Sequence, residues 1–286
     1  MGFCNIPLSE VEGGFFCTYY PINSRVTLRW AQHQSVKGGL VMSTDNSVWR
    51  LIPLTEASGR LQMAIDSWLL SQHEQGCHPS TLRFYTWQPV AISLGYHQRR
   101  WPEFWQNLQW HNQPIELVRR PSGGRGVLHQ GDLTYAVVTS GLSGSRSQIY
   151  RHISEFLITG WRSLGFNLDY GSAGRGYIHH PNCFGTATGA DLVLETGYKL
   201  IGSAQLCRGR AVLQHGSMRL TPDPDLQSHV FGTHPASPPL LSMGLQDVIE
   251  ALIMAATDRF GIQLDTQPLT EAEWEQIAKF VPQFSV

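Results

Sequence analysis

The chain has 286 residues and a formal net charge of −1, with 42% hydrophobic and 15% charged residues. This length and apolar content suit one large globular domain or two small ones, and they exclude a disordered chain. The near-neutral charge offers no basic excess for nucleic acid or for an anionic membrane, and no apolar run is long enough to span a bilayer. We therefore expect neither a nucleic-acid partner nor a membrane partner.

The cysteines indicate the redox environment. An odd number of widely spaced cysteines argues against a disulfide framework and for a reducing compartment, which predicts a cytoplasmic protein with at least one free thiol. The N-terminus also lacks the basic and apolar segments of a signal peptide. The five cysteines are Cys4, Cys17, Cys77, Cys183 and Cys207.

Residues 1–45 differ from the rest of the chain. They are rich in Gly and Ser, and no clean periodicity runs through them. Met42 begins a stretch that is typical of the start of a domain, so residues 1–41 either form a loosely packed extension or precede the natural start; we favour the second interpretation. We expect a single main domain over 46–262 and a C-terminal helix over 263–286.

Helical and strand periodicities alternate along the first half of the domain. Leu61, Ile65, Trp68 and Leu69 share one face of a predicted helix. Alternating apolar residues then predict a series of strands, the first two separated by Pro89. These strands cover 81–87, 90–96, 115–120 and 133–139.

The second half begins with a helix over 149–164, whose apolar residues form one stripe. A hairpin over 190–205 is expected to turn at Thr196-Gly197, and a strand over 211–220 follows it. Two more helices are expected at 245–260 and 270–280, the latter with a capping box of Thr270 and Glu273, and the proline-rich residues 234–240 form a loop. Most connections between the strands are too short for a crossover helix, which predicts an α+β fold with a mainly antiparallel sheet packed against helices.

The stretch "RRPSGGRGVLHQGDLTY", which begins at Arg119, is the strongest candidate for a ligand site. Glycines let the backbone adopt positive φ and let a ligand approach the main chain, and a loop between two strands can direct N–H groups at an anion or a carbonyl oxygen. The alternative interpretation is a loose hairpin with arginines in solvent. The loop is not a phosphate-binding P-loop, because no Gly-Lys-Ser/Thr follows it.

This loop resembles the Arg-Arg-x-Ser/Thr-Gly-Gly-x-Ala/Gly-Val-x-His signature of the lipoate–protein ligase, octanoyltransferase and biotin–protein ligase superfamily. The resemblance continues in the expected order through "QMAIDSWLL", "LRFYTWQPVAISLGYHQ", "YKLIGSAQ" and "LQHGSM", and it covers roughly 47–262. It implies a fold like that of class II aminoacyl-tRNA synthetases and biotin synthetases, with an acyl-transfer site. "LRFYTWQPVAISLGYHQ" is similar to the early hairpin of the family.

The resemblance also implies which residues surround the acyl group. The loop over the acyl chain is expected to consist of Arg120, Ser122, Gly123, Gly124 and His129. The carbonyl end is expected to be lined by Lys199, Gly202, Ser203 and Ala204, and the early hairpin is expected to contribute Gly95 and Gln98.

Cys183 is the expected nucleophile. "PNCFGTATGADLVL" resembles the Cys-Phe stretch that one group of transferases places before the lysine hairpin, although the aromatic and Ser usual after it are missing here. A free thiol has a pKa of about 8.5, and a nearby lysine ammonium stabilises the thiolate. The resemblance therefore implies Cys183 and Lys199 as the catalytic pair, with a thioester acyl-enzyme as intermediate.

The first functional hypothesis is an octanoyltransferase that needs no cofactor. It accepts octanoyl from acyl carrier protein on Cys183 and passes it to a lysine of a lipoyl domain or of the glycine-cleavage H protein. The arginines between Arg119 and Arg125 suit an acidic carrier protein. The runner-up is a lipoate–protein ligase that forms lipoyl-adenylate with ATP and Mg²⁺ and does not use the thiol. A third hypothesis is a non-catalytic lipoyl-domain-binding protein.

Other interpretations remain open for individual side chains. Cys207, in a predicted turn, is an alternative reactive thiol, and Lys199 is otherwise a solvated hairpin lysine. His129 and His215 suit core or turn positions. The stretch "HHPNC" at 179–183 mimics a metal site, but no second Cys/His pair of suitable spacing accompanies it, so we expect no metal.

Overall fold

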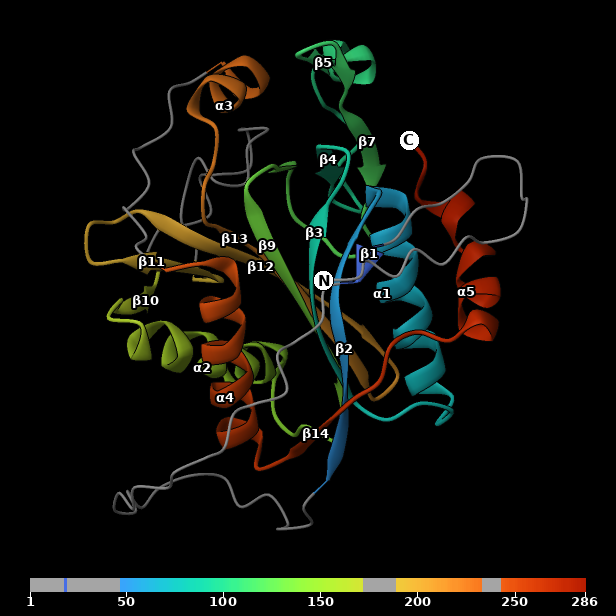
Figure 1. Cartoon of the computed structure of the whole chain (residues 1–286), viewed down its shortest axis with the longest axis vertical. Helices are drawn as coiled ribbons and strands as arrows, with labels where there is room; N and C mark the ends of the chain where they lie inside the picture. Colours follow the sequence, from blue (N-terminus) through green and yellow to red (C-terminus); the bar gives the residue numbers. More distant parts are fainter. Residues whose placement is uncertain (1–17, 20–46, 172–188, 233–242) are drawn as a thin grey trace.

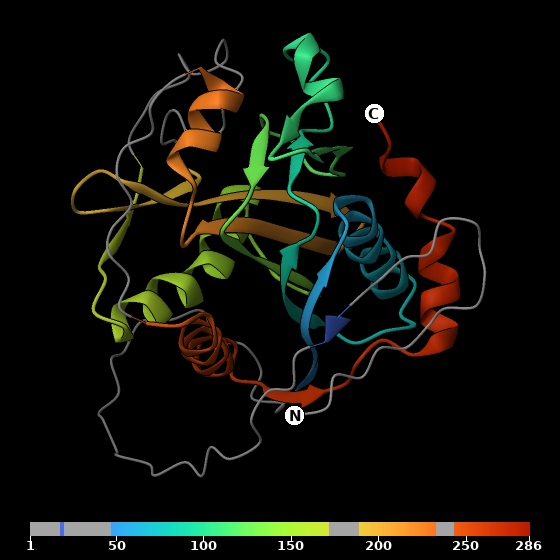
Figure 2. The ribbon, with the colours of Figure 1, turned by 45° about the horizontal axis from the view of Figure 1, so that its top comes forward.

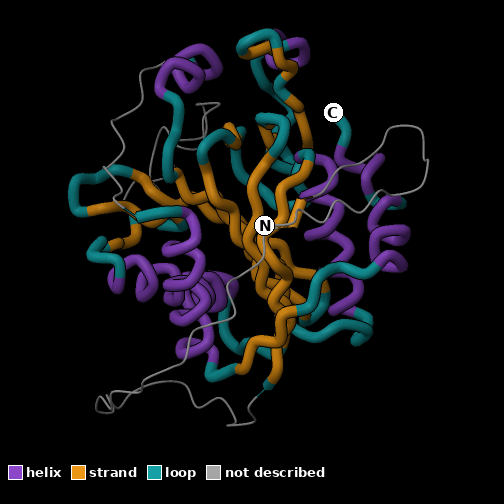
Figure 3. The backbone as a smooth tube through the Cα atoms, in the orientation of Figure 1, coloured by secondary structure: helices purple, strands orange, loops and turns teal. Residues whose placement is uncertain are grey.

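A computed structural model describes residues 18–19, 47–171, 189–232 and 243–286 of the chain. A large sheet forms the central layer, and helices pack on both of its faces (Figure 1). Figure 3 shows the strands as one continuous band between two groups of helices. Among the described residues, none of the helices combines the length and apolar character needed to cross a bilayer.

The large sheet has nine strands in the order β1-β2-β3-β9-β13-β12-β11-β10, with β14 paired to β2. Its strands are β1 (Thr18–Tyr19), β2 (Val48–Ala57), β3 (Thr81–Trp87), β9 (Asp132–Ser140), β10 (Leu168–Tyr170), β11 (Asp191–Leu194), β12 (Lys199–Arg208), β13 (Ala211–Arg219) and β14 (Gln263–Thr266).

Most neighbours in this sheet are antiparallel, as expected, and two pairs are parallel. Strands β2 and β3 are parallel because helix α1 (Gly59–Glu74) forms the crossover between them. Strand β14 returns from the far end of the chain to lie parallel to β2. The predicted α+β class is confirmed.

The alternation of side chains along each central strand divides the core into two layers. On β9, Tyr135 and Val137 point into one cluster, whereas Ala136 and Val138 point into the other. Helices α2 (Arg146–Ser163) and α4 (Leu245–Phe260) cover the first face, while α1 and α5 (Glu271–Ala278) cover the second (Figure 2).

The helices largely follow their predicted apolar stripes. Helix α2 begins three residues earlier than the stripe, because Ser145 and Gln148 form a capping box. The predicted box of Thr270 and Glu273 at the start of α5 is confirmed. The predicted turn at Thr196-Gly197 separates β11 from β12, and Gly197 has φ +80°.

A second, three-stranded sheet in the order β7-β4-β8 stands beside the large one. The expectation of an early hairpin is wrong, because β4 pairs with β7 and β8, whereas β3 pairs with β2 and β9. The Gly-Gly loop therefore connects β7 to β8, a strand that periodicity missed because it is only three residues long. The strands are β4 (Ala91–Leu94), β7 (Glu116–Arg119) and β8 (Val127–His129).

Short elements at the top of Figure 1 cover this small sheet. Leu226 and Val230 of helix α3 pack with Ile92 and Trp105 in a third apolar cluster. The sequence analysis missed α3, which begins after the N-cap Asp223, and the predicted loop 234–240 lies outside the described residues. The remaining short elements are η1 (Glu103–Asn107), β5 (Gln109–Trp110), β6 (Gln113–Pro114) and α3 (Pro224–Phe231).

A buried ion pair joins the C-terminal segment to the first long strand. Arg50 of β2 donates to both carboxylate oxygens of Glu273, at 2.6 and 2.9 Å, and also to the carbonyl oxygens of Gln267 and Pro268. Burial alone would raise the pKa of the Glu273 carboxyl. The hydrogen bonds from Arg50 and from the Thr270 backbone outweigh it, so the pKa lies below its ordinary value.

We expect Glu273→Gln to lower the free energy of unfolding by about 2 kcal/mol at pH 7, because a charged hydrogen-bonded pair is lost and Arg50 stays buried. Since the folded-state pKa is depressed, this stabilisation is present above the ordinary carboxyl pKa of 4.5 and disappears as the pH falls through the folded-state pKa. Urea unfolding between pH 7 and pH 3 measures the difference. The control is Glu271→Gln, which changes an exposed carboxylate in the same helix turn. Equal effects of the two substitutions would contradict this role.

Candidate active site

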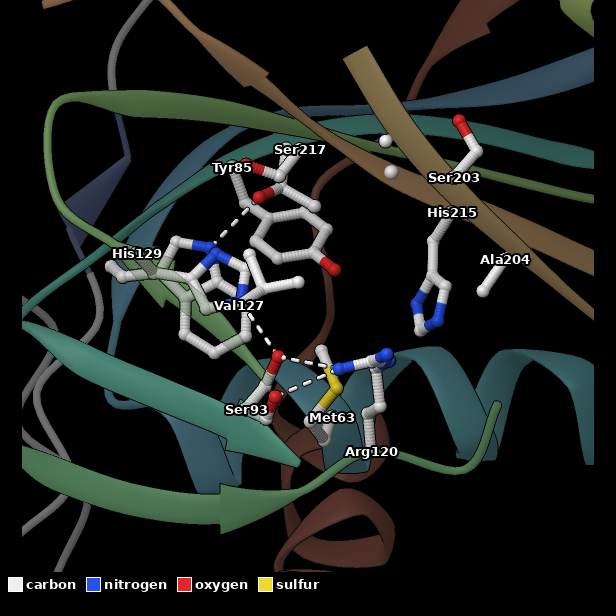
Figure 4. Close-up of a pocket in the computed structure, with 14 residues that line it drawn as sticks. Met63, Tyr85, Ser93, Arg120, Val127, His129, Ser203, Ala204, His215 and Ser217 are labelled. Carbon is white, nitrogen blue, oxygen red and sulfur yellow. Dashed lines mark hydrogen bonds between the residues drawn. The ribbon is translucent and has the colours of Figure 1, made fainter. Parts of the chain in front are cut away.

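A small cavity lies between the two sheets, on the α1 face of the large one (Figure 4). Its volume is about 40 Å³, enough for only a few water molecules. The side chains of His129 and His215 face it from opposite sides. Apolar walls come from Met63, Trp87 and Val127, and the rim includes Arg120, Gly202, Ser203 and Ala204.

Arg120 holds the Gly-Gly loop in shape. One terminal nitrogen donates to the carbonyl oxygen of Ser93 at 2.8 Å, and the other donates to the carbonyl oxygens of Gly123 and Arg125, each at 2.8 Å. The Arg120 side chain is buried, and it donates hydrogen bonds to backbone carbonyl oxygens of the loop and of β4. The alternative of a loose hairpin with Arg120 in solvent is therefore wrong.

Two glycines make this loop possible. Gly124 has φ +101°, and a Cβ there would lie 2.6 Å from an Arg120 terminal nitrogen. A Cβ on Gly95 would collide with the carbonyl oxygen of Gly124. Arg119 also donates to the carbonyl oxygens of Gly95 and Gln98, at 3.1 and 2.8 Å. Gly95 and Gln98 thus support the loop from behind and do not line the small cavity.

A chain of buried hydrogen bonds links Ser122 to helix α1. Ser122 Oγ lies 2.5 Å from His215 Nε2, and His215 Nδ1 lies 2.7 Å from Asp66 Oδ2. Asp66 also accepts from Arg83 at 3.0 Å and from the Tyr85 hydroxyl at 2.9 Å. Because the Asp66 carboxylate only accepts, we assign the proton to His215 Nδ1, and Nε2 accepts from Ser122.

A second chain of hydrogen bonds holds His129 in the wall of the small cavity. His129 Nδ1 lies 2.8 Å from Asp132 Oδ2, its Nε2 lies 2.8 Å from Ser93 Oγ, and its ring stacks on Trp87 at 3.6 Å. Burial lowers the pKa of His129, although Asp132 opposes the shift. Both nitrogens of each histidine are therefore occupied, which fits the core positions expected from sequence.

A larger cavity of about 730 Å³ adjoins the loop on its other side. Its lining includes Gly123, Gly124 and Asp191, together with the start of α2. Lys199 is buried, and its Nζ lies 2.9 Å from Asp191 Oδ1. The alternative of a solvated hairpin lysine is therefore wrong.

The remaining predicted residues separate into two groups. Gly202, Ser203 and Ala204 lie on β12, and the last two line both cavities. Cys183 and the "HHPNC" stretch lie outside the described residues, so the distance between Cys183 and Lys199 stays a prediction. In the described ranges, no three His, Cys, Asp or Glu residues gather as they would around a metal ion.

Cys207 lies in strand β12 and not in the turn that was expected. The turn of this hairpin follows at Gly209, which has φ +53°. The Cys207 side chain is half-buried, and its Sγ lies 3.7 Å from Gln205 Oε1. It does not line either of the two cavities described above.

The sequence analysis did not predict the three aspartates of the site. Asp66, Asp132 and Asp191 each hold a basic side chain of a predicted motif in place. Asp66 carried a usable signal, because it lies in the middle of the apolar helix "QMAIDSWLL". A carboxylate in such a position needs a buried partner.

The depressed pKa of His129 predicts a pH effect on stability. In the unfolded chain His129 takes up a proton near its ordinary pKa of 6.5, whereas in the folded chain burial opposes protonation, so stability falls as the pH drops below about 6.5. We expect His129→Gln to destabilise the protein at pH 7.5, and the gap to the wild type to narrow by pH 5.5. Urea unfolding at the two pH values measures the gap; a gap that widens would refute the assignment of a neutral, buried His129.

The chain is similar in sequence to a family of known catalytic domains. The model of the lipoyl protein ligase A/B catalytic domain matches residues 58–239. Octanoyltransferase LipM of Kyrpidia tusciae is 39% identical over 188 residues, which cover 62% of this chain and 68% of the relative. LipM of Halalkalibacterium halodurans is 33% identical over 264 residues, covering 81% and 95%. LipM of Bacillus subtilis is 37% identical over 199 residues, covering 65% and 70%.

Solved structures show the same fold. A putative lipoate protein ligase from T. acidophilum with bound lipoic acid has a TM-score of 0.67 at 24% identity, covering 82% of this chain and 95% of its own. A lipoate-protein ligase A bound with ATP has a TM-score of 0.67 at 23% identity, covering 82% and 94%. The matched catalytic-domain model spans well over half of the chain, and the chain therefore belongs to the lipoyl protein ligase A/B catalytic domain family.

Proposed function

We propose that this protein is an octanoyltransferase of protein lipoylation. It takes octanoyl from acyl carrier protein onto Cys183 and passes it to a lysine of a lipoyl domain or of the glycine-cleavage H protein. Relatives named octanoyltransferase, at 33–39% identity, support the activity. The observation that carries the proposal is the buried Lys199–Asp191 pair beside a cavity that the Gly-Gly loop also lines.

The chemistry proceeds by two acyl transfers. The Cys183 thiolate attacks the donor thioester carbonyl, the new C–S bond forms, and the donor thiolate leaves and takes a proton. The substrate lysine amine then attacks the acyl-enzyme, the C–S bond to Cys183 breaks, and the amine loses its proton. The first step exchanges one thioester for another, so we propose that transfer needs neither ATP nor a metal ion.

Lys199 is proposed to act through its charge. An ammonium near a thiol favours the thiolate, and a mobile proton there assists the departing sulfur. The pair with Asp191 keeps the ammonium in place at 2.9 Å. Cys183 lies six positions before Gly189, which lines the larger cavity, and six residues of extended chain span at most about 20 Å. This short connection supports the proposal that the thiol reaches the cavity.

The acyl chain is proposed to enter the small cavity between the sheets. Met63, Trp87 and Val127 give it apolar walls, whereas Ser203 and Ala204 join it to the larger cavity. Its volume of about 40 Å³ is too small for an eight-carbon chain, so side chains have to move. Met63 suits such a movement because its side chain is unbranched and flexible.

The ATP-dependent ligase is the less favoured alternative. The relatives above carry the name octanoyltransferase, whereas the ligase structures are similar at 23–24% identity and show the fold. We also propose a cytoplasmic location. The free thiols of Cys77 and Cys207 support a reducing compartment.

One experiment separates the three functional hypotheses. The protein is incubated with octanoyl-acyl carrier protein without ATP, and its intact mass is measured. We expect a gain of one octanoyl group that is absent in Cys183→Ala and is retained in the control Cys207→Ala. An adduct that forms only with lipoate and ATP would establish the ligase, and no adduct under either condition would establish the binding protein.

A further inference from the structure

Strand β12 connects three cavities in sequence order. The small cavity touches Gly202–Ala204, the larger cavity touches Ser203–Gln205, and a third cavity touches Gln205, Leu206 and Arg208. The third cavity has a volume of about 610 Å³ and shares Gly123, Arg146 and Gln205 with the larger one. Neighbouring cavities share lining residues, so together they outline a path along β12 from the tip of the β12–β13 hairpin toward Lys199.

The third cavity, which we name the arginine groove, carries one sign of charge. Arg119, Arg120, Arg146 and Arg208 line it together with His97, and its lining contains no Asp or Glu from the described ranges. The whole chain has 21 basic and 22 acidic residues, so this concentration of positive charge is a local feature. Such a concave basic surface attracts an acidic partner and speeds its association.

Two of these arginines are available to a partner. Arg146 and Arg208 are exposed, and within the described part of the chain neither side chain forms an ion pair. Arg119 and Arg120, in contrast, donate to backbone carbonyl oxygens and shape the groove wall. Tyr96, with 52% of its surface exposed, adds an aromatic ring of the kind that is enriched in protein interfaces.

The distance between Lys199 and Arg208 along β12 indicates which kind of partner docks at the arginine groove. Arg208 lies nine positions after Lys199, which at about 3.3 Å per residue places them about 30 Å apart along the strand. A lysine side chain on a protein docked at Arg208 is far too short to reach Lys199. A thioester at the end of a long flexible prosthetic arm can follow the path past Gln205 and Ala204.

We infer that the arginine groove is the docking surface for the acyl donor, an acidic carrier protein that threads its acylated arm along β12. This inference rests on the proposed function for the identity of the donor. The acceptor protein then approaches the larger cavity from elsewhere.

A binding measurement tests the proposed docking surface without octanoyl transfer. Acyl carrier protein that bears its arm but no octanoyl group is titrated into the full chain and followed by calorimetry. We expect Arg208→Glu and Arg146→Glu each to raise Kd about fivefold, as reversal of one exposed charge pair predicts. The loss of affinity on adding salt becomes smaller in both variants.

Arg162→Glu is the matched control. It makes the same charge change at an exposed position of the same helix as Arg146, about 24 Å farther along it, and it does not line the groove. We expect its Kd to equal that of the wild type. An effect as large as that of Arg146→Glu would overturn the proposal that the arginine groove is the docking surface, because net charge alone would then explain the binding.

Kinetics separates the donor from the acceptor. The kcat/KM is measured with octanoyl-carrier protein and with the uncharged donor octanoyl-N-acetylcysteamine. We expect Arg208→Glu to lower the ratio of the first value to the second about fivefold. A rise in KM for the lipoyl domain, with no change in this ratio, would overturn the donor assignment.

The docking inference and the proposed function fail in different ways. Octanoyl transfer from carrier protein that is insensitive to both arginine variants would overturn the docking surface and leave the transferase intact. Binding that depends on Arg146 and Arg208, without any octanoyl adduct, would overturn the transferase and support the docking surface.

Discussion

The pairing of β12 between β11 and β13 is the constraint on which the rest of the structure depends. It continues without interruption from Ile201 to Arg208 against β13, and β13 pairs along its whole length with β9. One backbone therefore fixes the positions of Lys199, of the cavity rim at Gly202–Ala204 and of Arg208. Among the described strands, β11 pairs with β12 only as far as Gly202, whereas β13 fixes the backbone of β12 up to Arg208, so the order of residues along β12 becomes an order of positions in space.

The buried carboxylates give hydrogen-bond partners to the basic side chains that lie between the two sheets. The motif places basic side chains and hydroxyl groups between two sheets, where unpaired polar groups cost several kcal/mol. Asp66 and Asp132 each pair with a histidine, whose other nitrogen reaches a serine of the loop or of β4. Asp191 does the same for Lys199. The motif residues hold the loop and cavity in shape, and these aspartates hold the motif residues.

Much of this arrangement can be predicted from the sequence, and the failures have physical reasons. The stripes of α1, α2 and α4 and the hairpin at Thr196-Gly197 are local patterns, and they were predicted correctly. The early hairpin, which the resemblance implied, is wrong because β4 pairs with β7 and β8. Asp66 and His215 are 149 residues apart, so no local pattern reveals their contact. Short β8 and helix α3 gave too few residues for a period to emerge.

The central chemical claim is that the Lys199 ammonium stabilises a thiolate on Cys183. The pH dependence of alkylation at Cys183, followed by peptide mass mapping, measures it in the wild type and in Lys199→Met/Asp191→Asn, which leaves no unpaired buried carboxylate. The account predicts a thiol pKa below about 8.5 in the wild type and a rise toward that value in the double variant. An ordinary pKa that is the same in both proteins would contradict it.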